Sequence, residues 1–154
     1  MKVIGLTGSI GMGKSTTAEM FAAHGDAVWD ADAAVHALYA GRAVARVGQF
    51  LPFAVVVGVV DRKRLGAAVI GKADALRALE AVVHPMVKAA ELAFLAEERA
   101  KGTAIAVLDI PLLLETRRSR TLDAVVVVSA PADVQQARVM ARPGMTVEPL
   151  LLME

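Results

Sequence analysis

The 154-residue chain lacks cysteine and asparagine altogether, and aromatic residues make up only 4% of it. Without cysteine the chain forms neither disulfides nor thiolate metal sites, which fits a reducing compartment. The formal net charge of +1 gives no bulk attraction to nucleic acid or to an anionic membrane. The longest apolar run, Phe50 to Val60, is far shorter than the ~20 residues that span a bilayer. We see no signal peptide before the first expected strand, and we predict a cytoplasmic protein with no nucleic-acid or membrane partner.

Alanine and valine supply much of the 56% hydrophobic content, a composition that suits a parallel sheet covered by alanine-rich helices. At this length we expect one α/β domain, residues 1–154. Apolar, β-branched runs predict four strands, at 2–7, 25–30, 104–109 and 123–129, and the last is apolar enough to be covered on both faces. Helical spacing and end signals predict helices at 16–24, 33–39, 42–50, 73–83, 85–100 and 131–142, with another after Asp61.

The best-defined motif is a phosphate-binding loop, Gly8-Ser9-Ile10-Gly11-Met12-Gly13-Lys14-Ser15, which fits the pattern G-x-x-x-x-G-K-[ST]. It follows a predicted strand and opens a predicted helix, which is the context this motif needs. Its glycines let successive backbone N–H groups turn inward around a phosphate, and the helix adds its N-terminal N–H groups. Lys14 can reach the β- and γ-phosphates, and the Ser15 hydroxyl can hold Mg²⁺. The sequence therefore predicts a nucleoside triphosphate site.

Two acids, Asp30 and Asp32, end the second predicted strand. Ligands of open α/β sheets bind beyond the carboxyl ends of the strands, so these acids are placed for an acceptor substrate. Either acid can serve as a general base or help to position Mg²⁺. Asp32 also precedes an alanine-rich helix and can equally be its N-cap.

Other candidates follow later in the chain. Asp109 ends the third strand, where an acid binds Mg²⁺ through water, and Glu115 follows near the same edge. Arg138 and Arg142 are four residues apart on one predicted helix face, where they fit either a phosphoryl clamp or surface charge. His84 precedes Pro85, a position more typical of a cap or a packed residue than of a catalyst.

Other classes of phosphate-loop protein fit less well. A GTPase needs an Asn-Lys-x-Asp segment, and the chain has no asparagine. Small size, acids after the second strand and late arginines together favour a kinase of small hydroxyl-bearing metabolites.

In its motifs the chain resembles the dephospho-CoA kinase family over nearly its whole length. The resemblance is carried by an ordered set of segments: Leu6 to Thr16, Asp30-Ala31-Asp32, Asp61-Arg62 with Leu65, His84-Pro85 with Val87, Pro111-Leu112-Leu113 with Glu115, and Arg138 with Arg142 before Gly144. It implies a three-layer P-loop kinase fold and ATP- and Mg²⁺-dependent phosphorylation of the ribose 3′-hydroxyl of dephospho-CoA. The alternatives are another small-metabolite or nucleoside monophosphate kinase of this fold, and a non-catalytic nucleotide-binding remnant.

The resemblance also implies residue roles. Asp32 would be the catalytic base, with Lys14, Arg138 and Arg142 stabilising charge in the transition state. Asp30, Asp32 and His84 would contact the acceptor, and His84 would do so from a helical CoA-binding insertion at about 42–87. Ser15 and Asp109 would hold the metal, with Glu115 as a further candidate. ATP phosphates would be bound by Gly8, Gly11, Met12, Gly13, Lys14, Ser15 and Thr16.

The sequence departs from the family pattern at two places. Ser9 stands where the family usually has glycine. After the lid region at about 131–154, the family continues with a glutamine-bearing helix, a fifth strand and a final helix. We therefore expect a sheet that lacks the fifth strand and an incomplete lid.

Overall fold

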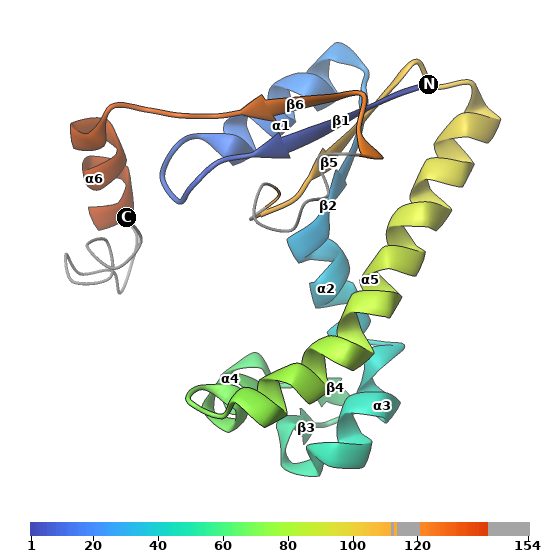
Figure 1. Cartoon of the computed structure of the whole chain (residues 1–154), viewed down its shortest axis with the longest axis vertical. Coiled ribbons are helices and arrows are strands. Elements are labelled where there is room, and N and C mark those ends of the chain that lie inside the picture. Colours follow the sequence, from blue (N-terminus) through green and yellow to red (C-terminus); the bar gives the residue numbers. More distant parts are fainter. Residues whose placement is uncertain (112, 114–120, 142–154) are drawn as a thin grey trace. The chain divides into compact units, whose positions relative to one another are not determined.

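The computed structural model describes residues 1–111, 113 and 121–141 (Figure 1). The chain divides into two compact units, one made of residues 1–29 and 98–154 and the other of residues 30–97. None of the described helices has the length and apolar character needed to cross a membrane.

The first unit is built on a four-stranded sheet in the order β2-β5-β1-β6. The strands are β1 (Lys2–Thr7), β2 (Ala27–Asp30), β5 (Ile105–Asp109) and β6 (Ala124–Val127). Both neighbours of β1 run parallel to it. Apolar, β-branched strands of this kind were predicted at all four places, and the predicted α/β class is confirmed.

Burial divides this sheet unevenly. Leu6 in β1 and Ala106 and Val107 in β5 are fully buried, because these two strands lie inside the sheet. β6 lies at the edge, and its Val127 is 57% exposed. The prediction that the 123–129 run is covered on both faces is therefore wrong. A run of valines can form an edge strand as well as a central one, because valine favours the extended backbone in either position.

Two helices complete the described part of this unit. α1 (Lys14–His24) begins at Gly13 and ends at Gly25, which has a φ of 96° and donates its N–H to the carbonyls of the last turn. This C-cap is the predicted glycine stop. α6 (Ala132–Met140) follows Pro131 at its N-cap. Both helices thus begin and end within two residues of the predicted bounds.

The second unit is a small helical body. It contains α2 (Ala31–Tyr39), α3 (Ala43–Phe50), the 3₁₀ turn η1 (Pro52–Ala54), α4 (Arg62–Val69) and most of α5 (Ala73–Lys101). Asp61 caps α4 as predicted, accepting a hydrogen bond from the Arg64 N–H at 2.9 Å. One core joins these elements: Leu38, Tyr39, Ala43, Val47, Leu51, Ala54, Val60, Leu65, Ala68, Leu79 and Val83.

Helix α5 corrects the predicted break at His84-Pro85, because it runs through Pro85 without interruption. Proline removes a single N–H from the hydrogen-bond ladder, the one that would reach the Ala81 carbonyl. Val83 before the proline and Met86 after it pack in the same core. This packing on both sides holds the helix continuous across one missing bond.

A two-residue hairpin joins β3 (Val55–Val56) to β4 (Val59–Val60) where the sequence showed no clear period. Its turn residues Val57 and Gly58 have φ values of 50° and 75°. Tight hairpin turns with two positive φ angles favour Asn-Gly or Asp-Gly. Because valine stands at the first turn position in place of asparagine or aspartate, the sequence did not predict this hairpin turn.

We predict that Val57→Asn stabilises the protein by about 1 kcal/mol, because asparagine tolerates the left-handed backbone that a β-branched residue resists. Val57 is 96% exposed, so the substitution removes little packing. Urea denaturation measures the gain. Val59→Asn is the matched control: it makes the same change on the adjoining strand and should give no stabilisation. An equal gain at both positions would contradict the backbone explanation.

Candidate active site

The phosphate loop connects β1 to α1 (Figure 1). Gly11 and Gly13 have φ values of 77° and 100°, which residues with a Cβ rarely adopt. At Gly8 the constraint is space, since an added Cβ would lie 2.6 Å from the Val128 carbonyl oxygen. These three positions therefore require glycine; the motif specifies it at Gly8 and Gly13, and the structure adds Gly11.

Lys14 and Asp109 meet beside this loop. The Lys14 Nζ donates a hydrogen bond to Asp109 Oδ1, and the two side chains are only 19% and 6% exposed. The register of the sheet explains the meeting, because Leu6 near the end of β1 lies opposite Asp109 at the end of β5. A carboxylate this buried requires a cationic or hydrogen-bonding partner. The expected phosphate-binding lysine thus forms an ion pair with the expected metal-binding acid.

Helix α6 contacts the loop from the other direction. Arg138 Nη1 donates to the Gly11 carbonyl at 3.3 Å, and Gln135 Nε2 donates to the Ile10 carbonyl at 2.9 Å. The Ala130 N–H, just before this helix, donates to Met12 Sδ at 3.0 Å. Each partner on the loop is an acceptor. These contacts engage the loop through carbonyl oxygens and a thioether.

Gln135 was not predicted as a site residue. Gln135 is three residues before Arg138, so both lie on one helix face. This spacing is the only feature of the sequence that could have indicated Gln135 as a site residue. Its side chain also lies beside Gly11, where an added Cβ would be 3.3 Å from Gln135 Cγ. Only the packing of α6 on the loop reveals this role.

The two acids after β2 belong mainly to the second unit, which begins at Asp30. Asp30 is the N-cap of α2, and its Oδ1 accepts from the N–H groups of Asp32 and Ala33 at 2.8 and 3.0 Å. Of the two alternatives for Asp32, the N-cap is therefore wrong, because the helix begins two residues earlier than predicted. Asp32 lies in the first turn, with an exposed side chain that makes no hydrogen bond or ion pair in the described part of the chain.

The remaining predicted residues fall in different places. His84 lies on α5 and is exposed. Ser15 and Thr16 lie in the first turn of α1 and are also exposed. Arg142 and Glu115 lie outside the described residues.

Oxygen donors suited to Mg²⁺ are present at the loop. The Ser15 hydroxyl and the Asp109 carboxylate are both hard ligands of the kind this ion prefers. The described residues contain no group of three or more His, Cys, Asp or Glu side chains that could hold a metal by themselves.

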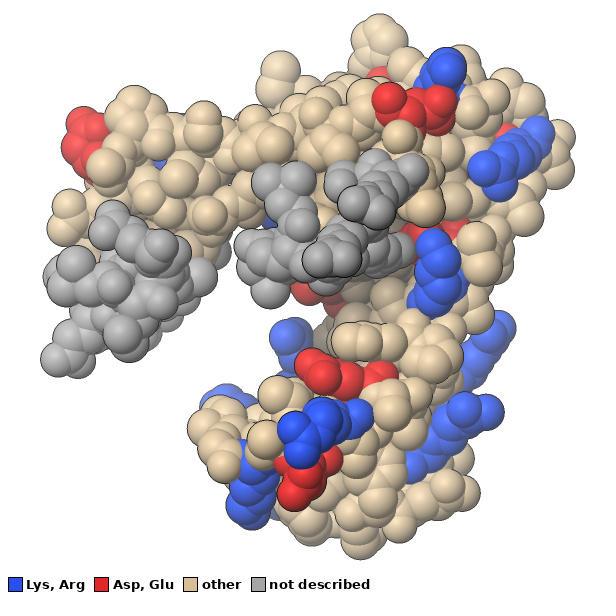
Figure 2. All heavy atoms as spheres, viewed as in Figure 1, with Lys and Arg blue, Asp and Glu red and all other residues tan. Residues whose placement is uncertain are grey.

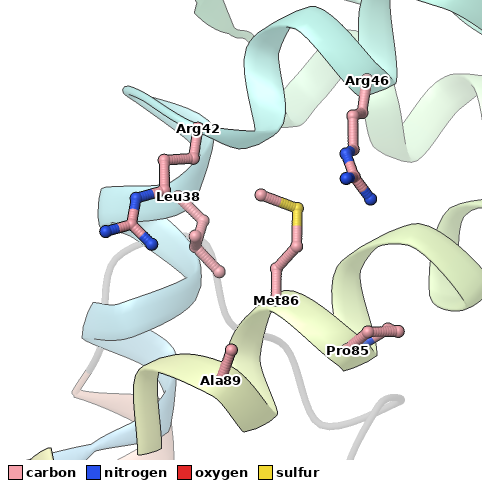
Figure 3. A pocket seen from close by; sticks show the side chains of 6 residues that line it. All are labelled: Leu38, Arg42, Arg46, Pro85, Met86 and Ala89. Atoms are coloured by element: carbon pink, nitrogen blue, oxygen red, sulfur yellow. The ribbon is translucent and has the colours of Figure 1, made fainter. Parts of the chain in front are cut away.

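The second unit contains a cavity of about 430 Å³. It is lined by Leu38, Arg42, Arg46, Pro85, Met86 and Ala89 (Figure 3). Figure 2 shows both basic and acidic side chains on the face that it draws.

Comparison with known proteins gives a consistent result. Residues 2–151 match the protein family described as CoaE, dephospho-CoA kinase. A dephospho-CoA kinase of Mesorhizobium japonicum is 60% identical over 150 residues, which cover 97% of this chain and 76% of the relative. One from Brucella melitensis is 56% identical over 97% of this chain and 75% of the relative.

Two solved structures are also similar. A Thermus thermophilus protein has a TM-score of 0.82 and 38% identity, over 98% of this chain and 77% of the other. The dephospho-CoA kinase of Campylobacter jejuni has a TM-score of 0.72 and 26% identity, over 99% of this chain and 79% of the other.

We predict that Gln135→Glu weakens ATP binding about tenfold, because an ionised glutamate of the same size cannot donate to the Ile10 carbonyl and repels it. Calorimetric titration with ATP measures the change. Gln136→Glu is the matched control, since it adds the same charge to the exposed neighbouring residue of α6. Equal weakening by both substitutions would assign the effect to charge alone.

Asp109→Asn should destabilise the ligand-free protein by about 2 kcal/mol, because it leaves the partly buried Lys14 ammonium without its carboxylate. Urea denaturation compares it with Asp74→Asn, which breaks the exposed Asp74–Arg77 pair. The Asp74–Arg77 pair should contribute almost nothing to the free energy of unfolding, because exposed ion pairs usually contribute little. If Asp109→Asn is as mild as its control, the Lys14 contact does not stabilise the fold.

Proposed function

The chain belongs to the dephospho-CoA kinase family, and from that premise we propose that it transfers the γ-phosphate of ATP to the ribose 3′-hydroxyl of dephospho-CoA. The products are coenzyme A and ADP. The family match over residues 2–151 carries this proposal, together with a phosphate loop whose strand, glycines and helix are all present. The partners are then two small molecules, ATP and dephospho-CoA, and the compartment is the cytoplasm.

The donor half of the reaction is supported by the loop geometry. Backbone N–H groups between Gly8 and Thr16 would surround the β- and γ-phosphates, aided by the N-terminus of α1. Lys14 would exchange its contact with Asp109 for phosphate oxygens as ATP binds. Arg138 contacts the loop through the Gly11 carbonyl, and its guanidinium would stabilise charge that develops on the transferred group. Arg142 is proposed for the same task.

Ser15 and Asp109 would hold Mg²⁺ with the ATP phosphates. When bound, the ion neutralises charge on the phosphates as the transferring group leaves. The exposed Ser15 hydroxyl and the Asp109 carboxylate, which reaches Lys14, supply donors of the right chemistry for this role.

The acceptor half would depend on Asp32. Because Asp30 caps α2, the Asp32 carboxylate retains its lone pairs for a substrate hydroxyl. As general base it would take the proton of the 3′-hydroxyl while the oxygen attacks the γ-phosphorus. Asp30 would help indirectly by fixing the first turn of α2, and His84 would contact the CoA portion of the acceptor.

We predict that Asp32→Asn lowers kcat by ~10²-fold or more and leaves ATP affinity unchanged, because the amide cannot accept the proton. ADP release with dephospho-CoA and product mass measure turnover, and calorimetry measures ATP binding. Asp74→Asn, the same substitution at a 97% exposed position of the same unit, should retain full activity.

Two outcomes would count against these assignments. Turnover that survives Asp32→Asn would remove Asp32 as the base. A wild-type preference for a nucleoside monophosphate or shikimate over dephospho-CoA would overturn the proposed acceptor.

A further inference from the structure

The phosphate loop contains a methionine, Met12, directly before Gly13 and Lys14. The chain has no cysteine, so its sulfur chemistry belongs to its seven methionines. Peroxides react first with thiolates where a protein has them, and here they can react only with thioethers. The Met12 residue is partly exposed. Its sulfur is therefore the group through which an oxidant can act on the loop.

The Met12 thioether holds the loop to the segment that leads into α6. Its Sδ accepts a hydrogen bond from the Ala130 N–H at 3.0 Å. Ala130 lies between the end of β6 at Val127 and the start of α6 at Ala132. Thioether sulfur is only a weak acceptor, so this contact depends on the sulfur and the N–H staying in place. Both partners belong to the first unit.

The loop is closely packed on both sides of this contact. An added Cβ at Gly8 would lie 2.6 Å from the Val128 carbonyl oxygen, and one at Gly11 would lie 2.7 Å from Val139 Cγ2. Val139 is only 2% exposed, because α6 rests on the loop there. The side chains of α6 that donate to the Ile10 and Gly11 carbonyls belong to the same contact surface. An extra atom at this surface must displace one partner.

Oxidation of Met12 to the sulfoxide would break the contact with Ala130, whichever epimer forms. The 3.0 Å between Sδ and the amide nitrogen is the length of one hydrogen bond, so it leaves no room for an oxygen between them. An oxygen on the lone pair that faces Ala130 would therefore push the segment away. An oxygen on the other lone pair becomes the acceptor of the side chain and points away from the N–H. These two positions correspond to the two sulfoxide epimers.

We propose that Met12 is a reversible oxidation site through which hydrogen peroxide weakens ATP binding. The O–O bond of the peroxide breaks and an S–O bond forms at Sδ. The sulfur gives up two electrons, and the second oxygen leaves as water with both hydrogens. The sulfoxide separates α6 from the loop, which then loses the support of Gln135 and Arg138. The assignment rests on the proposed function, since it takes ATP as the ligand of the loop.

Treatment with hydrogen peroxide, followed by peptide mass mapping and calorimetric titration with ATP, tests this site. We expect the ATP affinity of the wild type to fall at least about tenfold as Met12 is oxidised, and to recover after treatment with methionine sulfoxide reductases. Met12→Leu should keep its own affinity on treatment. Each protein is compared with itself before and after peroxide, so an effect of the substitution on basal binding cancels. Met20→Leu is the matched control: it removes a 68% exposed thioether of α1 and should lose affinity as the wild type does.

Hydrogen exchange at the Ala130 amide, followed by NMR, gives a second measurement that needs no nucleotide. We expect faster exchange in the oxidised wild type, because the N–H has lost its acceptor. Unchanged exchange, affinity that is retained with Met12 oxidised, or an equal loss in Met12→Leu overturns the oxidation site and leaves the function standing. A reduced wild type that binds ATP but phosphorylates no dephospho-CoA overturns the function and leaves the oxidation site standing. If the reduced wild type binds no ATP, the function fails and the amide exchange decides whether oxidation breaks the contact.

Discussion

The ion pair between Lys14 and Asp109 is the contact on which the candidate site depends. It joins the helix after β1 to the end of β5, and it exists because the two strands run parallel in a register that brings their carboxyl ends level. The Lys14 ammonium is partly buried and is stabilised by a counter-charge when no phosphate is bound. The Asp109 carboxylate is nearly buried and needs a cationic or hydrogen-bonding partner. Each residue therefore satisfies the other until a nucleotide enters. In the proposed mechanism, phosphate oxygens would replace the carboxylate at Lys14, and the Asp109 carboxylate would then bind the metal ion.

The phosphate loop is supported from outside by α6. Gln135 and Arg138 donate to successive loop carbonyls, and such contacts use the side of each peptide that a phosphate does not need. Preorganised N–H donors are worth most when they do not have to rearrange during the reaction. The same helix that would supply charge to the transferred phosphate thus also steadies the loop that binds ATP. A substitution on α6 can affect both tasks, which is why Gln135 and Gln136 form an informative pair.

The helical unit carries Asp32 and the cavity on a single packed core. Its core continues across Pro85, so α5 presents a rigid wall to the cavity where a broken helix would have left a loose turn. Asp30 takes over the capping of α2 and leaves Asp32 exposed. Asp32 and the cavity residues Leu38, Arg46 and Met86 are then all carried by helices packed on one core. Sites on rigid elements hold their geometry better than sites on loops.

Short-range rules determined much of this protein from sequence alone. The spacing of Gly8, Gly11 and Gly13 before Lys14 predicts the loop because only glycine fits those backbone angles and contacts. Apolar runs predict the four strands, and Gly25 and Asp61 mark helix ends through local hydrogen bonds. These features depend on residues that are near one another in the chain.

Tertiary structure decided the rest, because it depends on which distant residues meet. The edge position of β6, the continuity of α5 and the pairing of Lys14 with Asp109 follow from packing and register that no local pattern encodes. Gln135 reads in sequence as an ordinary surface residue until α6 packs on the loop. Arg42 and Arg46 likewise line one cavity with Met86, forty residues later, only because α3 and α5 share one core.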